Sequence, residues 1–193
     1  MSYIGQALLF LIQVAFGFYI LLVLLRLLFQ LARADFYNPV SQFIVTLTQP
    51  PLGFLRRFIP GLFGIDLAAV VLLLLLQMLE IYLLAWLRGG SPALPGVALL
   101  AAAQLVQLAV YVYIVAILVR VVLSWVNPYG MRHPAAALLY DLTEPMMAPA
   151  RRLIPPIAGL DLSPIAVLVL LQLTLILVVR PLADLGVRLS VVF

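Results

Sequence analysis

Two clusters of arginine and aspartate are the side chains in this sequence best suited to chemistry. Each has two adjacent arginines and, nine residues after the second, an aspartate that opens an apolar stretch. Guanidinium groups bind phosphate and carboxylate oxygens, and a helix start favours negative charge. Such a cluster could contact a lipid headgroup, another anion or a partner protein. The clusters are Arg56, Arg57 and Asp66, and Arg151, Arg152 and Asp161.

Two further arginines, Arg26 and Arg120, lie one to two turns inside the ends of long apolar stretches. In each half of the chain, this arginine and the aspartate of the cluster fall at similar depth. We favour an ion pair between them, or an arginine that extends to the headgroups, either of which would fix two helices together. A headgroup or anion site at the helix start is the alternative, with the adjacent arginines supplying the phosphate contacts.

Four polar residues fall deep inside apolar stretches. Gln77 and Gln172 each lie 11 residues after an aspartate, about 16 Å along a helix and therefore near mid-bilayer. They could meet across a two-fold axis and join helices. A polar pathway is the alternative, because an intramembrane carboxylate such as Glu80 is a functional candidate. Gln13 lies at comparable depth and is the expected partner of Glu80, which has no acidic counterpart in the second half.

Several kinds of chemistry are excluded by the residues that are missing. The chain has no cysteine and one histidine, His133. The lack of cysteine excludes disulfides, thiolate metal sites, covalent haem attachment and a thiol nucleophile. One histidine cannot supply two axial haem ligands, and no serine–histidine–aspartate arrangement or glycine-rich phosphate loop is evident. We therefore expect no enzymatic activity, no metal site and no cofactor.

The composition places these residues in a membrane protein. Hydrophobic residues make up 66% of the 193 residues and charged residues 9%, whereas about a quarter of a soluble domain is charged. Mean hydropathy is +1.25. A span needs about 20 apolar residues, and no cleavable signal peptide is visible. The predicted spans are residues 3–31, 67–87, 97–126 and 162–179.

Two proline-rich segments separate the members of each pair of spans. Residues 35–66 and 127–161 are apolar but are interrupted by prolines too often to cross lipid alone. We expect each to form two short helices that lie at the interface or dip into it and return. In the second segment these would be Pro134–Tyr140 and Pro145–Leu153. Residues 88–96, rich in glycine and proline, form a turn.

The two halves of the chain are copies of one unit. Nine of the 22 residues from Thr48 recur 95 positions later, from Thr143, including both arginine pairs and both aspartates. Upstream the offset is 94 and relates Arg26 to Arg120. The first repeat is therefore residues 1–88, the turn 89–96 and the second repeat 97–193. Each unit has two spans, so both units point the same way and a two-fold axis along the membrane normal should relate them.

The distribution of arginines predicts the orientation. All 11 basic residues are arginine, without a long basic run, which favours membrane topology and headgroup contacts over nucleic-acid binding. More arginines lie on the side of the proline-rich segments than on the other side. The positive-inside rule then places those segments in the cytoplasm and both termini in the periplasm. The arginines on the proline-rich side are Arg33, Arg56, Arg57, Arg132, Arg151 and Arg152, and those on the other side are Arg88 and Arg188, with Arg180 at its edge.

The order T-x-P, R-R-x-I-P and G-x-D-L-S-P before an apolar helix resembles the unit of the YggT family, also called YlmG-like. The second copy matches this unit better than the first. The first copy has Ala68-Ala69 in place of Ser-Pro. The second copy has His133-Pro134 where the first has Asn38-Pro39, which is the form typical of the family. The resemblance implies an all-α membrane protein with one or two such units. It also implies links to osmotic stress, cell division or, in plastids, cytochrome b6 maturation, and it implies no shared enzymatic activity.

Three functional hypotheses follow. The first is a non-enzymatic scaffold or assembly factor of the bacterial inner membrane that binds lipid or other membrane proteins through its proline-rich segments. The second is a small transporter or channel in ion or osmotic homeostasis, which needs a continuous polar path. The third, an enzyme acting on lipid, lacks an acid–base pair. We prefer the first. Four spans with few interhelical polar groups could also form a homo-oligomer.

Overall fold

The computed structural model describes residues 3–62, 64–126, 133–154 and 161–190, and within them the chain is helical, with one isolated backbone bridge between Leu62 and Ile65. Apolar stretches become helices because helices satisfy their own backbone hydrogen bonds, as lipid requires. The elements are α1 (Tyr3–Leu31), α2 (Pro39–Leu55), α3 (Leu67–Leu87), α4 (Leu94–Val126), α5 (Pro134–Leu153), α6 (Ser163–Thr174), the π-helical turn η2 (Leu175–Val179) and α7 (Arg180–Ser190).

Four helices are long and apolar enough to cross a membrane: α1, α3, α4 and the continuous helix Ser163–Ser190 formed by α6, η2 and α7. The four spans predicted from composition are therefore confirmed. The fourth was predicted to end at Val179, but the helix runs on to Ser190. The continuation is amphipathic: Arg180, Asp184 and Arg188 are exposed, whereas Gly186 is buried against α4. Packing on α4 thus extends the helix beyond the point where apolarity stops.

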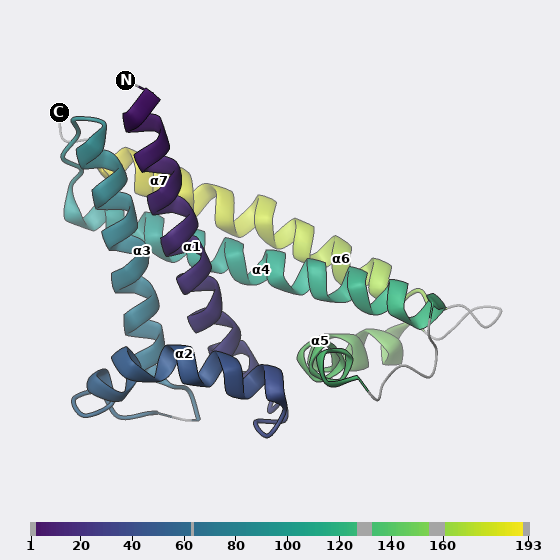
Figure 1. Ribbon diagram of the computed structural model, residues 1–193. Helices are drawn as coiled ribbons and strands as arrows, with labels where there is room; N and C mark the ends of the chain where they lie inside the picture. The colour runs from purple at the N-terminus through teal and green to yellow at the C-terminus, as the bar shows by residue number, and fades with distance from the viewer. Residues whose placement is uncertain (1–2, 63, 127–132, 155–160, 191–193) are drawn as a thin grey trace.

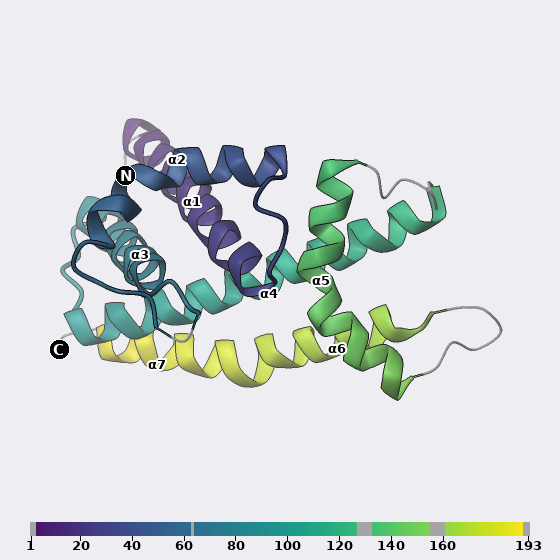
Figure 2. The same ribbon diagram turned by 90° about the horizontal axis from the view of Figure 1, so that it is seen from below.

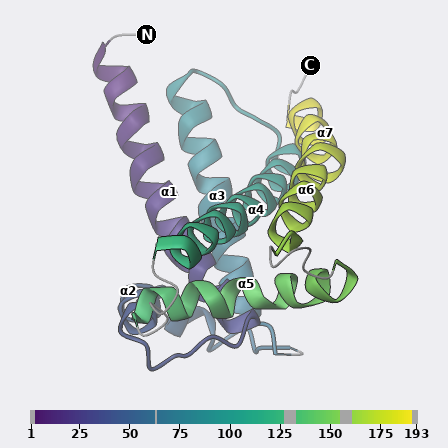
Figure 3. The same cartoon turned by 90° about the vertical axis from the view of Figure 1, so that its right-hand side faces the viewer.

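The two repeats run in the same direction. The start of α1 and the end of α7 lie at one end of the molecule, and α2 and α5 lie at the other (Figures 1 and 3). In each repeat a spanning helix leads to a crossing helix, and a second spanning helix leads back. The parallel arrangement predicted from the repeat is confirmed within the described residues.

Each proline-rich segment contains one helix among the described residues, not the two short helices expected. The prolines Pro50 and Pro51 lie inside α2, and α5 is unbroken from Pro134 to Leu153, so the break predicted after Tyr140 is wrong. A proline removes the hydrogen bond to the carbonyl four residues earlier. The Leu47 carbonyl that Pro51 leaves free accepts a bond from the Tyr19 hydroxyl of α1 at 3.4 Å. A neighbouring helix thus supplies the missing donor and the crossing helix continues.

Small residues bring α4 and α7 close together. A Cβ added at Gly186 would lie 2.7 Å from the Leu100 backbone nitrogen, and one at Gly96 would lie 2.1 Å from the Ser190 nitrogen. Only glycine permits this approach. Because lipid tails are as apolar as the side chains, helices in a membrane associate through close packing of this kind.

The two repeats do not pack symmetrically. The returning helix of the first repeat, α3, contacts α4, the first helix of the second repeat. Within the described residues the returning helix of the second repeat, α6, has no such contact with α1, because α4 lies between them (Figures 2 and 3). The larger buried cluster includes Ile20, Val23, Leu52 and Ala68 and joins the first repeat to α4 and α5, whereas the smaller joins α4, α5 and α6. The two returning helices therefore do not face each other across an axis.

Candidate functional site

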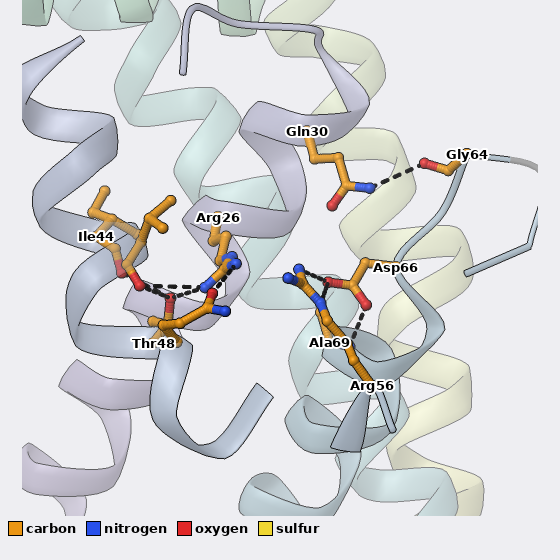
Figure 4. Close-up of polar contacts among 10 residues, drawn as sticks. Arg26, Gln30, Ile44, Thr48, Arg56, Gly64, Asp66 and Ala69 are labelled. Carbon is orange, nitrogen blue, oxygen red and sulfur yellow. Dashed lines mark hydrogen bonds and ion pairs between the residues drawn. The ribbon is translucent and has the colours of Figure 1, made fainter. Parts of the chain in front are cut away.

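A buried arginine ties the first spanning helix of the first repeat to its crossing helix. Arg26 of α1 is 5% exposed and donates from Nη1 to the Thr48 hydroxyl at 2.9 Å and from Nη2 to the Gln49 side-chain oxygen at 2.8 Å (Figure 4). Thr48, fully buried, donates in turn to the Ile44 carbonyl. The guanidinium therefore crosslinks two helices through neutral oxygens.

The same contact recurs in the second repeat with a charged partner. Arg120 of α4 donates to the Thr143 hydroxyl at 2.7 Å and to the Glu144 carboxylate at 2.8 Å. Thr143 is fully buried and donates to the Leu139 carbonyl. The Arg120 guanidinium also stacks on the Tyr140 ring at 4.0 Å. We call these two contacts the arginine–threonine ties.

The crossing helices begin with matching caps. The Asn38 side chain accepts a hydrogen bond from the Val40 N–H, and at the same position of the second repeat His133 Nδ1 accepts one from the Ala135 N–H at 3.3 Å. Asn38 also donates to the Pro134 carbonyl at 2.8 Å, which links α2 to α5. His133 is thus a helix cap. Among the described residues, no group of three histidine or acidic side chains could hold a metal ion.

The first arginine cluster lines an open pocket. Arg56 donates from Nε and Nη2 to one oxygen of Asp66, which caps α3 by accepting from the Ala69 N–H with the other (Figure 4). Gln30 at the end of α1 donates to the carbonyl of Gly64, whose φ of 81° favours glycine. These groups surround a pocket of about 400 Å³. The Arg56 side chain is 39% exposed, so it can reach a ligand while paired.

The second cluster is joined to its arginine–threonine tie. Arg151 contacts Asp161 at 3.6 Å and Glu144 at 2.7 Å, so Glu144 bridges Arg151 and Arg120. Burial raises the pKa of the Glu144 carboxyl, but the hydrogen bonds and charges of Arg120 and Arg151 outweigh it, and the pKa is lowered. The Asp161 carboxylate accepts a hydrogen bond from the N–H of Ser163, the first residue of α6. Burial raises its pKa too, but bonds from Ser163 and the charges of both arginines lower it.

The structure corrects the predicted ion pairs. The favoured arrangement was an ion pair of Arg26 with Asp66 and of Arg120 with Asp161, or arginines that extend to the headgroups; the ion pairs are wrong, because all four salt bridges of the described residues join other partners. The aspartates pair with Arg56 and Arg151 because both members of each pair lie near the start of the returning helix. The remaining members of the clusters, Arg57 and Arg152, are exposed, and within the described residues their side chains have no recorded hydrogen bond or ion pair.

The intramembrane polar residues form one cluster and two isolated sites. Gln77 donates to the Glu80 carboxylate and to the Gln104 side-chain oxygen of α4, both at 2.9 Å. The expected contacts of Gln77 with Gln172 and of Glu80 with Gln13 are wrong, because Gln172 and Gln13 are exposed on the outside of the molecule. No continuous line of polar residues connects the two ends through the described part of the chain.

Sequence reasoning missed most partners in these contacts, including Thr48, Gln49, Thr143, Glu144 and Gln104. Thr48 and Thr143 carried a usable signal, because they are identical across the repeat and immediately precede Gln49 and Glu144. Position 132, counted with the arginines of this face, lies outside the described residues.

Comparison with known proteins identifies relatives over nearly the whole chain. A sequence model of the family described as CCB3/YggT matches residues 5–87 and 99–182. An uncharacterised protein of Pseudomonas aeruginosa is 41% identical over 182 residues, covering 93% of this chain and 92% of the relative. The uncharacterised protein YggT of Escherichia coli K12 is 35% identical over 162 residues, covering 84% of each. No solved structure matches the chain.

A further relative matches a third of the chain. The uncharacterised protein ycf19 of Guillardia theta is 38% identical over 64 residues, which covers 32% of this chain and 67% of the relative.

Proposed function

The chain belongs to the CCB3/YggT family, and we propose that it is a non-enzymatic scaffold or assembly factor of the bacterial inner membrane. The surface that would bind partners carries the exposed arginines near the ends of α2 and α5, with the pocket beside Arg56. We call this surface, which comprises Arg56, Arg57, Arg151 and Arg152, the arginine face. In this proposal it lies in the cytoplasm, both termini lie in the periplasm, and the partners are lipid headgroups and other membrane proteins.

The observation that carries the proposal is that some arginines bond other helices of the chain, whereas others are exposed and free to meet a partner. Arg26, which is buried, and Arg120, which is half-buried, donate hydrogen bonds to the crossing helices and so hold helices together. Arg57 follows α2 and Arg152 lies in the last turn of α5; both are exposed, and the two helices lie at the same end of the molecule (Figure 3). Exposed guanidinium groups beside a membrane attract anionic headgroups and acidic protein segments. A role in osmotic stress, division or membrane-protein maturation would be carried out through such contacts.

Site-specific photocrosslinking in cells tests this role. A photoreactive amino acid replaces Arg57 or Arg152 in separate variants, and Arg188, exposed on α7 at the opposite end, serves as the control. We expect the two variants of the arginine face to capture the same membrane protein, and the control not to capture it. Capture of different proteins at random from the three positions, or of none, would contradict a scaffold that binds through this face.

A small transporter is the second candidate, because Gln77, Glu80 and Gln104 form a polar cluster inside the membrane-spanning part. An intramembrane carboxylate is a common element of ion pathways. Ion flux into proteoliposomes distinguishes the two candidates. A transporter requires flux that falls when Glu80→Ala is combined with Gln77→Leu, whereas a scaffold predicts no protein-dependent flux in either preparation.

A further inference from the structure

The pocket beside Arg56 lies at the level of the lipid headgroups. Its walls come from the end of α1 and from the loop that joins α2 to α3, and Asp66 opens α3 at its edge. The helix α3 has 21 residues, which is about 31 Å at 1.5 Å per residue and matches the hydrocarbon thickness of a bilayer. Asp66 therefore marks the boundary of the hydrocarbon, and the loop residues that line the pocket lie among the headgroups.

Two polar side chains in this pocket have hydrogen-bonding capacity left. Arg56 donates to Asp66 from Nε and Nη2, but its Nη1 has no recorded hydrogen bond within the described residues. Gln30 donates its amide to the Gly64 carbonyl at 3.2 Å, and no described residue donates to its side-chain oxygen (Figure 4). The pocket thus offers a charged donor and a neutral acceptor to the same ligand.

The balance of charge in the pocket distinguishes between ligands. The residues that line it carry one positive charge, on Arg56, and one negative charge, on Asp66. The buried Arg26 does not line the pocket, and its guanidinium bonds α2. A lining without net charge attracts an anionic ligand only weakly. A zwitterion, in contrast, can place each of its charges beside the opposite charge.

The matching arginine of the second repeat has fewer donors to spare. Arg151 pairs with two carboxylates, one on α5 and one that precedes α6. In the first repeat Gln49 stands where the second repeat has the carboxylate on α5, so Arg56 pairs with Asp66 alone among the described residues. Arg56 therefore keeps a donor for a phosphate group.

The rest of the lining is apolar and suits the glycerol end of a lipid. Ile59, Pro60 and Ile65 line the pocket beside the polar groups. On the same loop the Phe58 side chain is 71% exposed, and an exposed aromatic side chain at this depth contacts the membrane interface. A headgroup in the pocket would therefore remain attached to acyl chains in the leaflet beside the loop.

We propose that this pocket binds the headgroup of phosphatidylethanolamine, a zwitterionic phospholipid. Nη1 of Arg56 donates to the phosphate, and the ammonium group donates to the side-chain oxygen of Gln30 on the side of Asp66. The pocket volume of about 400 Å³ falls in the range of small-ligand sites. The inference rests on the proposed function, because it names the headgroup that one part of the arginine face takes.

Native mass spectrometry of the purified full-length protein tests the choice of headgroup. The protein is equilibrated in micelles that contain equal amounts of phosphatidylethanolamine, phosphatidylcholine and phosphatidylglycerol. We expect one phosphatidylethanolamine per chain, retained about 5-fold more than either competitor. The methylated ammonium of phosphatidylcholine cannot donate to Gln30, and the headgroup of phosphatidylglycerol has no positive charge to place beside Asp66.

Substitutions in the pocket locate the bound lipid. Arg56→Gln should lower retention of phosphatidylethanolamine by about 10-fold, because a charge-assisted bond to the phosphate is lost. Arg56→Lys keeps a cation beside Asp66 and so tests the site if Arg56→Gln does not fold. It should also weaken retention, because one ammonium group cannot serve Asp66 and the phosphate in the manner of a guanidinium fork. The control Arg88→Gln, at the exposed opposite end of α3, should leave retention unchanged.

Three results would overturn the proposal. The first is retention of phosphatidylglycerol equal to or above that of phosphatidylethanolamine. The second is unchanged retention in both Arg56→Gln and Arg56→Lys. The third is displacement of the lipid by an equal concentration of soluble glycerophosphoethanolamine, which would make a free phosphoethanolamine compound the ligand. None of these results bears on protein capture at Arg57 and Arg152, so failure of this inference is distinguishable from failure of the scaffold role.

Discussion

At the scale of single residues, the two arginine–threonine ties differ by one functional group. Gln49 in the first repeat occupies the position of Glu144 in the second, and each accepts a bond from Nη2 of the arginine at 2.8 Å. In the first tie the buried guanidinium of Arg26 has neutral partners. In the second tie the Glu144 carboxylate neutralises the charge of Arg120. A buried charge without a counter-charge is costly, so the two ties should contribute unequally to stability.

Exchanging the two acceptors tests this difference. We expect Glu144→Gln to lower the free energy of unfolding by about 1 kcal/mol, because the bridge to Arg120 and Arg151 is lost from a site that remains partly exposed. We expect Gln49→Glu to raise it by about 0.5 kcal/mol, because it supplies Arg26 with a carboxylate. Denaturation of the purified protein in mixed micelles measures both, and a loss of stability in Gln49→Glu would contradict the argument.

The carboxylates of the second repeat predict a pH dependence. The pKa of Glu144 is lowered in the folded state from its ordinary value of 4.5, and the pKa of Asp161 from 3.8. A lowered pKa contributes stability that is present above the ordinary value and is lost as the pH falls through the folded value. The melting temperature should therefore fall as the pH drops below about 5. Glu144→Gln should reduce that fall. If the variant and the unmodified protein lose melting temperature equally at low pH, the bridge of Glu144 to Arg120 and Arg151 does not form.

Only part of this detail could be predicted from the sequence. The arginines, the aspartates and the intramembrane glutamines were identified because polar residues are rare in this chain. Their pairing was wrong, because residues at similar depth can face different helices. Depth along a helix follows from counting residues, whereas the direction in which Arg26 or Gln172 points depends on how the helices pack.

At the scale of elements, close helix contacts hold the second repeat together. The helices α4 and α7 touch backbone to backbone where Gly186 meets Leu100. Composition predicted the spans, but it predicted that the fourth ends at Val179, because composition carries no information about packing against α4. Composition also predicted breaks at the prolines. At Pro51 the helix α2 continues, because the Tyr19 hydroxyl of α1 bonds the Leu47 carbonyl that this proline leaves free.

Adding one methyl group at this contact should weaken it. In Gly186→Ala the new Cβ would lie 2.7 Å from the Leu100 nitrogen, so α7 must shift. We expect the free energy of unfolding to fall by about 1–3 kcal/mol. Gly53→Ala is the matched control, since its Cβ would meet only the end of the Gln49 side chain at 3.9 Å, and it should leave stability unchanged or slightly raised. Equal effects of both changes would show that the helices are not in close contact.

At the scale of the whole molecule, duplication explains why both arginine pairs lie at one end. Parallel repeats place equivalent residues on the same side of the membrane, so the repeat alone predicts a face that bears four arginines. The repeat did not predict the asymmetric packing of the two halves. That asymmetry arises because α4 packs on two returning helices, α3 and α7, whereas within the described residues α1 packs extensively on only one returning helix, α3.

The central claim is that this arginine face lies in the cytoplasm, where a scaffold would meet its partners, and the cysteine-free chain allows a direct test. Single variants Arg57→Cys, Arg152→Cys and Ser91→Cys, the last in the turn between the repeats, are treated with a membrane-impermeant thiol reagent in right-side-out and inverted membrane vesicles. We expect Arg57→Cys and Arg152→Cys to be labelled only in inverted vesicles, and Ser91→Cys only in right-side-out vesicles. Labelling of Arg57→Cys and Arg152→Cys from opposite sides, or of both from the outside, would contradict the parallel repeat or the cytoplasmic face.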